Sequence, residues 1–80
     1  MGTVRLSTLM IYSEAVTPAP NGTTTIFNVS NAYVSGKLKV FMDGLGQLAG
    51  TDFSEVNDTS FQFVVAPATD NYIQVDYMKK

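Results

Sequence analysis

The chain has 80 residues, a net charge of −2, and neither cysteine nor histidine. This composition excludes disulfides, thiolate nucleophiles, the usual zinc ligands and a histidine general base. The acidic balance and the absence of a clustered basic stripe argue against a nucleic-acid partner. A domain this small buries a modest core, so without crosslinks we expect it to gain stability by associating with neighbours.

Residues 1–13 are expected to form an N-terminal arm or an edge strand. They mix apolar residues such as Leu9 and Ile11 with polar ones, and such a strand can extend the chain's own sheet or that of a neighbouring subunit. The apolar run is too short to span a membrane and lacks a signal-peptide pattern. We therefore expect a chain that is soluble as made and not exported through an N-terminal signal.

Residues 14–80 are expected to form a β-domain. Prolines and an Asn-Gly pair interrupt regular structure at 17–22, and the β-branched and aromatic run 23–29 then predicts a strand. Residues 37–42 alternate between apolar and other side chains, which is the period of a strand with one core face. Asp43-Gly44 follows directly and predicts a tight hairpin turn with a short partner strand near 45–48.

The C-terminal half contains further short strands between turn signals. A short extended piece is predicted at 51–53, a turn at Asn57-Asp58, and strands at 60–65 and 72–77. A helical turn is conceivable only near 30–35. The spacing predicts an all-β fold, a small antiparallel β-sandwich of about six or seven short strands. The predicted core consists of Phe27, Val29, Leu38, Val40, Met42, Phe53, Phe61, Phe63, Ile73, Val75 and Tyr77.

Several apolar residues fall on the strand faces assigned to solvent, which suggests a second face covered by a partner or by residues 3–12. Ile26, Phe41 and Val64 are examples. Scattered exposed apolar residues are normal, but several in so small a domain favour a contact surface. The candidate interface residues are Leu9, Ile11, Tyr12, Ile26, Tyr33, Phe41, Val64 and Tyr72.

No catalytic, cofactor or metal site is predicted. Four acidic residues in the central turns resemble a calcium site only superficially, because their spacing matches no EF-hand loop and acidic residues also stabilise turns directly. They are Asp43, Asp52, Glu55 and Asp58. No serine has a possible base partner, and no carboxylate pair is flanked by the groups that glycoside hydrolysis needs. Tyr12, Tyr33 and Tyr72 are compatible with a sugar-stacking platform, although tyrosine is equally suited to a protein interface.

The order of short motifs resembles a module of bacteriophage virion proteins, found in tail-fibre, tail-tip and head-surface components. The resemblance covers roughly residues 14 to 78. The motifs are Pro20-Asn21-Gly22 before 24–29, Val34-Ser35-Gly36 before 38–41, Met42-Asp43-Gly44, Gly50-Thr51-Asp52-Phe53, Phe61-Gln62-Phe63 before Ala66-Pro67, and Ile73-Gln74-Val75-Asp76-Tyr77. That module is a compact β-sandwich, usually embedded in longer fibres and usually without enzymatic activity. We expect this sequence to differ from that module in being a free-standing chain with the additional segment 1–13.

The resemblance implies a non-enzymatic virion structural protein. The expected role is a capsid decoration or cement subunit that oligomerises, with a trimer as the favoured form, and bridges the major capsid protein or other virion proteins. The expected location is the particle surface after synthesis in the host cytoplasm, without a nucleic-acid, membrane or cofactor partner. The alternatives are a receptor- or glycan-binding module of a tail tip or fibre, and a head-tail connector or baseplate subunit.

Overall fold

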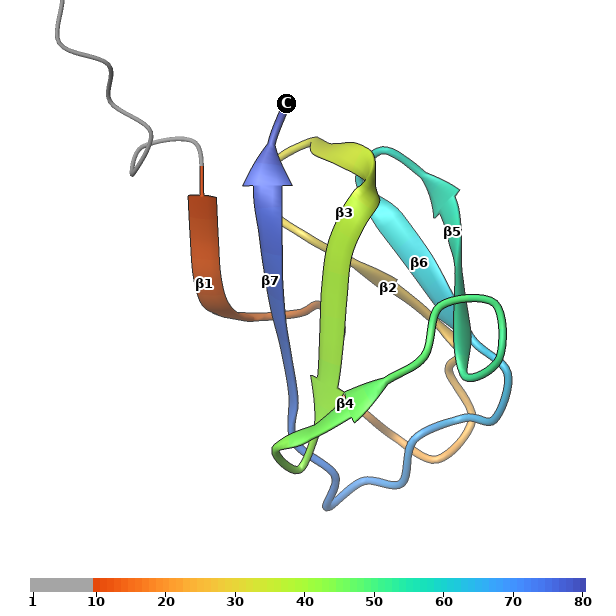
Figure 1. Ribbon diagram of the computed structural model, residues 1–80. Helices are drawn as coiled ribbons and strands as arrows, with labels where there is room; N and C mark the ends of the chain where they lie inside the picture. Colours follow the sequence, from red (N-terminus) through yellow and green to blue (C-terminus); the bar gives the residue numbers. More distant parts are fainter. Residues whose placement is uncertain (1–9) are drawn as a thin grey trace, which may run out of the picture.

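The computed structural model describes residues 10–80, which form seven strands and no helix (Figure 1). All strand pairs are antiparallel. The all-β prediction is therefore confirmed. The strands are β1 (Met10–Ala15), β2 (Ile26–Asn28), β3 (Tyr33–Met42), β4 (Leu45–Gln47), β5 (Phe53–Asn57), β6 (Ser60–Phe63) and β7 (Ile73–Lys79).

The strands form two sheets that enclose one core. One sheet has the order β1-β7-β3-β4 and is called sheet A, and the other has the order β2-β6-β5 and is called sheet B. Figure 1 shows β7 and β3 in front of the more distant β2 and β6. β1 is an edge strand of sheet A and crosses the boundary that the sequence suggested after residue 13.

The hairpin between β3 and β4 confirms the turn predicted at Asp43-Gly44. Met42 pairs with Leu45, and Asp43 and Gly44 have positive φ angles of 53° and 83°. Two successive residues with positive φ define the turn type that matches the twist of paired strands. The Asp43 carboxylate also accepts hydrogen bonds from the Tyr72 N–H and the Asn71 side chain, both at 2.8 Å. This carboxylate therefore joins the hairpin to the start of β7.

Side-chain oxygens organise the other predicted turns. The Asn57 Oδ1 atom accepts hydrogen bonds from the Thr59 N–H at 2.9 Å and from the Ser60 hydroxyl at 2.9 Å. This closes the turn between β5 and β6. Asn21 stabilises its own loop similarly, because its Oδ1 atom accepts from the backbone N–H groups of the second and third residues that follow it.

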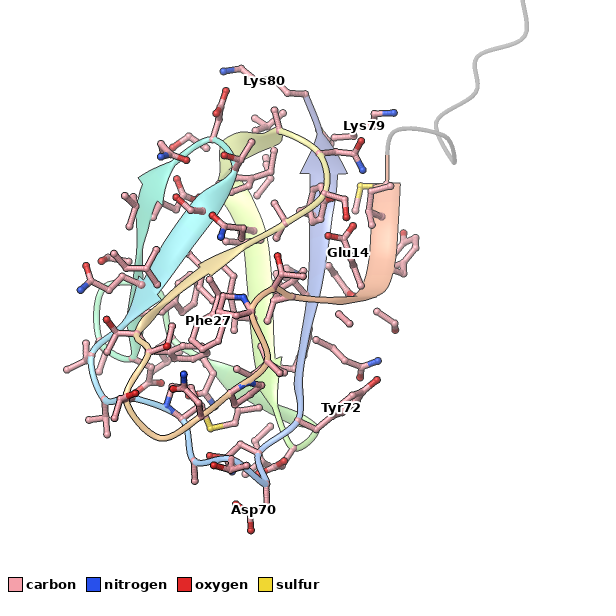
Figure 2. All side chains as sticks on the ribbon, turned by 180° about the vertical axis from the view of Figure 1, so that it is seen from behind. Glu14, Phe27, Asp70, Tyr72, Lys79 and Lys80 are labelled. Atoms are coloured by element: carbon pink, nitrogen blue, oxygen red, sulfur yellow. The ribbon has the colours of Figure 1, made fainter. Side chains whose placement is uncertain are left out.

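The core between the sheets matches the predicted set with few exceptions. Sheet B and its loops contribute mainly phenylalanines, including Phe27, which Figure 2 shows within the sandwich. Met42 is only partly buried against this core, whereas Val16 and Tyr33 belong to it and were not predicted to. The buried apolar residues are Val16, Phe27, Val29, Tyr33, Leu38, Val40, Phe53, Phe61, Phe63, Ile73, Val75 and Tyr77.

β3 begins four residues earlier than the alternating pattern indicated. Its register against β7 shifts between Tyr33 and Leu38, and Gly36 has a φ of 82° within this stretch. Such an irregularity breaks the period of two on which strand prediction depends. Residues 30–35, where a helical turn was conceivable, therefore lead into the strand instead.

Two carboxylates link the sheets on opposite sides of the sandwich. On β1, Glu14 accepts hydrogen bonds from the Tyr77 hydroxyl at 2.8 Å and from the Ser30 N–H at 2.7 Å. On β5, Glu55 accepts hydrogen bonds from the Ser35 hydroxyl and the Gly36 N–H, both at 2.8 Å. Each glutamate thus connects its edge strand to a backbone N–H group of a segment with which that strand does not pair.

Candidate interaction surface

The predicted interface residues do not form one surface. Ile26 is exposed on the outer face of sheet B, and Val64 is exposed just beyond the end of β6 in the same sheet. Phe41 is partly buried on the outer face of sheet A. Tyr72 is exposed immediately before β7, at the end of the molecule opposite Lys79 (Figure 2). The apolar residues assigned to solvent are therefore divided between the two sheets.

The N-terminal members of the predicted set have different environments. Leu9 lies outside the described residues. Ile11 pairs with Tyr77 and packs against the core, so its side chain is on the inner side of sheet A. Tyr12 is 66% exposed and is the member of this group that a partner can reach.

Tyr33 lies in the core rather than on a surface, which corrects its assignment to the interface. It is 1% exposed, and its ring meets the Tyr77 ring edge-on at a centroid distance of 6.1 Å. Its hydroxyl donates a hydrogen bond to the Ser60 carbonyl oxygen at 2.7 Å. Burial raises the pKa of Tyr33 to about 12, with further contributions from the negative charges of Glu55 and Asp58. A buried phenol with a satisfied hydroxyl offers nothing to a partner.

The three tyrosines therefore do not make a sugar-stacking platform. Tyr12 lies opposite Asp76 in the pairing of β1 with β7. Tyr72 precedes that point by four residues on the other strand, a separation of about 13 Å at the rise of an extended strand. With Tyr33 buried, the exposed rings are two separate features.

A groove runs along the outer face of β7 in sheet A. Its floor consists of Gln74, Asp76 and Met78, which are all partly buried. Two shallow depressions of about 400 and 230 Å³ lie along it and share Asp76. We call this feature the β7 groove. Its residues are Met10, Tyr12, Ser13, Gly36, Lys37, Lys39, Phe41, Gly44, Gln74, Asp76 and Met78.

The walls of the β7 groove differ in chemistry. The β1 wall presents Met10 and Tyr12, whereas the β3 wall presents Lys37 and Lys39. Farther along β3, the Phe41 ring lies over Gly46, where an added Cβ would sit 3.9 Å from it. The groove therefore combines an apolar wall, a cationic wall and a carboxylate on the floor.

A bulge in β1 shapes the first of these walls. Ile11 pairs with Tyr77 and Glu14 with Val75, so two residues of β1 oppose Asp76. The second of these, Ser13, has a φ of 54°. Its backbone N–H donates to the Asp76 Oδ1 atom at 2.8 Å. Asp76 therefore stabilises the bulge and turns one oxygen away from the lysine wall.

The charges across the groove are not paired within residues 10–80. Lys39 and Asp76 are cross-strand partners, but the ion pair found in this part of the chain joins Lys80 and Asp58 at 3.4 Å. Both members of that surface pair are well exposed, so it contributes little stability. Lys37 and Lys39 thus leave an uncompensated positive strip beside the groove floor.

Three acidic residues of the central turns accept hydrogen bonds from backbone N–H groups. Asp43 accepts a hydrogen bond from the Tyr72 N–H of another loop, Asp52 accepts one from the Leu48 N–H of its own loop, and Glu55 links the sheets as described. Asp58 instead pairs with the Lys80 side chain. Residues 10–80 contain no cluster of three potential metal ligands. This geometry is what turn and loop stabilisation requires.

Sequence reasoning missed the β7 groove because it treated exposed apolar residues one at a time. The alternation along β7 places Gln74, Asp76 and Met78 on one face, and this signal was present in the sequence. The bulge opposite Asp76 left no such signal, because Tyr12 and Ser13 continue an ordinary strand pattern.

The protein is therefore a small antiparallel β-sandwich, and the outer face of its sheet A carries the β7 groove. A search for helices long and apolar enough to cross a membrane found none among residues 10–80. Comparison with protein-family models, curated proteins and solved structures found no match.

Proposed function

We propose that this protein is a non-enzymatic structural subunit that works by associating with neighbouring proteins. The observation that carries the proposal is that the domain has one buried core and nevertheless exposes several large apolar side chains. Leu45, Leu48 and Val65 add to the exposed apolar residues already described. Among residues 10–80, eight large apolar side chains are exposed, and although they are spread over both sheets, this number on so small a domain favours contact with more than one neighbour.

The chemistry of the polar groups supports the same proposal. The carboxylates of Glu14, Asp43 and Glu55 are each engaged by hydrogen-bond donors of the chain itself. In the described part of the chain, buried side-chain polar atoms all have hydrogen-bond partners. A catalytic centre usually holds strained or incompletely satisfied polar groups, and the polar groups here are used to hold the fold.

The assembly that we propose is a phage virion, in which the protein decorates or cements the capsid and contacts the major capsid protein or other virion proteins. The support is the ordered set of motifs that resembles virion modules, together with the two-sheet architecture. Individually weak contacts suffice on a particle, because repetition over a lattice multiplies their effect.

Quantitative mass spectrometry of purified particles tests this proposal. We expect the protein in many copies per particle, comparable with the capsid protein. A few copies per particle would favour a connector, baseplate or tail component, and its absence from particles would refute the virion role. A glycan array provides the second test, because binding that is lost in Tyr12→Ala or Tyr72→Ala would favour the glycan-binding alternative.

A further inference from the structure

We propose that the β7 groove is a self-association surface, and that its occupant is the same face of a second copy of this chain. The inference rests on the proposed structural function and names a partner for it. It is carried by the arrangement of charge on sheet A, where Lys37 and Lys39 project from β3 and Asp76 from the neighbouring β7.

This arrangement is complementary to itself under a two-fold rotation. Lys39 and Asp76 lie side by side at the same level of adjacent strands. A two-fold axis that runs along the strands, midway between β3 and β7, places β3 of each copy over β7 of the other. Each Lys39 then faces the Asp76 of the other copy, so one contact is formed twice, as in every isologous interface.

The distances are compatible with this contact. Packed sheet faces lie about 10 Å apart, and an extended lysine side chain from one face spans most of that gap. The same rotation sets Phe41 of each copy over Gln74 of the other, because these residues are also cross-strand partners. One arrangement thus provides charge pairing and packs the Phe41 ring on the side chain of Gln74.

The part of the chain that the structure describes leaves these charges available. In residues 10–80, Lys39 makes no ion pair with Asp76 despite their pairing, and the Oδ1 atom of Asp76 is held by the Ser13 N–H. The Oδ2 atom of Asp76 has no hydrogen bond to this part of the chain. A second copy supplies a cation for it without disturbing the bulge.

The size of the groove limits the strength of the contact. A standard interface takes about 20–30 residues from each partner, whereas the groove and its walls comprise eleven. We therefore expect a weak dimer that depends on concentration and salt. Because the isologous contact closes at two copies, it favours a dimer over the trimer expected from the sequence.

A charge-reversal pair tests the proposal with the full-length protein. Lys39→Glu and Asp76→Lys each place like charges in both contacts of a homodimer, so each variant alone should dimerise at least about tenfold more weakly than the original protein. In a mixture of the two variants, both contacts of the heterodimer join opposite charges. One contact joins the two substituted side chains with their signs reversed, and the other joins the unchanged Lys39 and Asp76. We expect sedimentation velocity to show dimer recovery in the equimolar mixture.

Matched variants separate this result from general effects of charge and folding. Lys79→Glu and Asp70→Lys make the same charge changes at residues that do not line the groove, and both should dimerise like the original protein. Asp76→Asn keeps an acceptor for Ser13 but removes the charge, and it should weaken dimerisation.

Three results would overturn the inference: an original protein that stays monomeric up to about 1 mM, variants that dimerise unchanged, or a mixture that behaves as the sum of its components. If the dimer fails while particles still contain many copies of the protein, the contact is wrong and the proposed structural role stands. Particles without the protein would refute the role independently of the dimer.

Discussion

The two aromatic groups of the core are built on different principles. In the first, Phe61 contacts Phe27, Phe53 and Phe63 at centroid distances of 6.2, 5.9 and 5.5 Å. In the second, Tyr33 and Tyr77 meet edge-on, and both hydroxyls are hydrogen-bonded. The phenylalanine group depends on shape alone, whereas the tyrosine group also depends on particular polar partners.

This difference shows how a small core can be both stable and specific. Phenyl rings are stabilised by burial and by edge-to-face contacts, and no polar atom limits how they pack. Each buried tyrosine hydroxyl must instead find its partner, here the Ser60 carbonyl oxygen and the Glu14 carboxylate. Tyr33 therefore fixes how the two sheets meet, Tyr77 fixes how β1 sits on β7, and the phenylalanines provide apolar burial without such constraints.

The largest expected effect comes from removing the centre of the phenylalanine group. Phe61→Ala deletes a ring that is 0% exposed and touches three others. The cavity should lower the free energy of unfolding by about 3–5 kcal/mol, which is a large fraction of the roughly 5–15 kcal/mol by which a typical domain is stable. Urea denaturation followed by circular dichroism measures the change. Phe41→Ala, which removes the same ring from the partly exposed outer face, should cost clearly less, and equal losses would contradict this ranking.

Alkaline pH is expected to act on the tyrosine group alone. A tyrosine titrates near 10 in the unfolded chain, whereas burial raises the pKa of Tyr33 to about 12 in the folded protein. Between these values the folded state binds more protons than the unfolded state, so stability is complete below pH 10 and falls as the pH rises to about 12. The loss should approach about 3 kcal/mol.

Denaturant midpoints measured from pH 8 to 12 test this dependence. Burial also raises the pKa of Tyr77, which contributes a loss of the same sign. Phe61→Ala should shift the whole profile downward without changing its slope. A flat profile between pH 10 and 12 would contradict the expected role of the tyrosine group.

Removing one hydroxyl should have a smaller effect. Tyr33→Phe keeps the ring but deletes the donor to the Ser60 carbonyl oxygen. We expect a loss of about 1–2 kcal/mol at neutral pH, because a buried acceptor loses its partner. The variant should also lose most of the alkaline slope, so that its deficit relative to the original protein shrinks above pH 10 and is cancelled before pH 12. A slope that persists unchanged would assign the titration to another group.

The smallest expected effect concerns the partner of Tyr77. Glu14→Gln keeps the length of the side chain but replaces two charge-assisted hydrogen bonds by weaker neutral ones. A loss of about 1 kcal/mol is expected. Glu55→Gln is the matched variant on the opposite side of the sandwich, where the glutamate hydrogen-bonds no tyrosine but its charge contributes to the raised pKa of Tyr33. Thermal unfolding of both at pH 7 and pH 11 should show a smaller alkaline loss for each variant, through Tyr77 in Glu14→Gln and through Tyr33 in Glu55→Gln.

Most of the fold could be predicted from the sequence because the core strands follow simple alternation. Leu38 and Val40 on β3 and Ile73 and Val75 on β7 are predicted and observed as buried. Asp43-Gly44 also gave a local signal strong enough to locate its hairpin. These features depend on neighbouring residues, which a sequence displays directly.

The candidate surface could be predicted only in part, since it depends on which strands become neighbours. Tyr33 was misplaced because the bulge at Gly36 changes the side on which the preceding residues project. The β7 groove brings Tyr12, Lys39 and Asp76 together from three separate strands. Those pairings are long-range and leave no mark on the local pattern.

The pairing of Met10 with Met78 has a practical consequence for engineering. Cross-strand partners have Cα atoms about 5 Å apart, so residues 10 and 78 are adjacent at one pole, and the Asp43-Gly44 turn is at the other (Figure 1). Both junctions with a host protein can therefore be made at one point. The domain is suited to insertion into a surface loop of a host protein, where the hairpin between β3 and β4 would point away from the host.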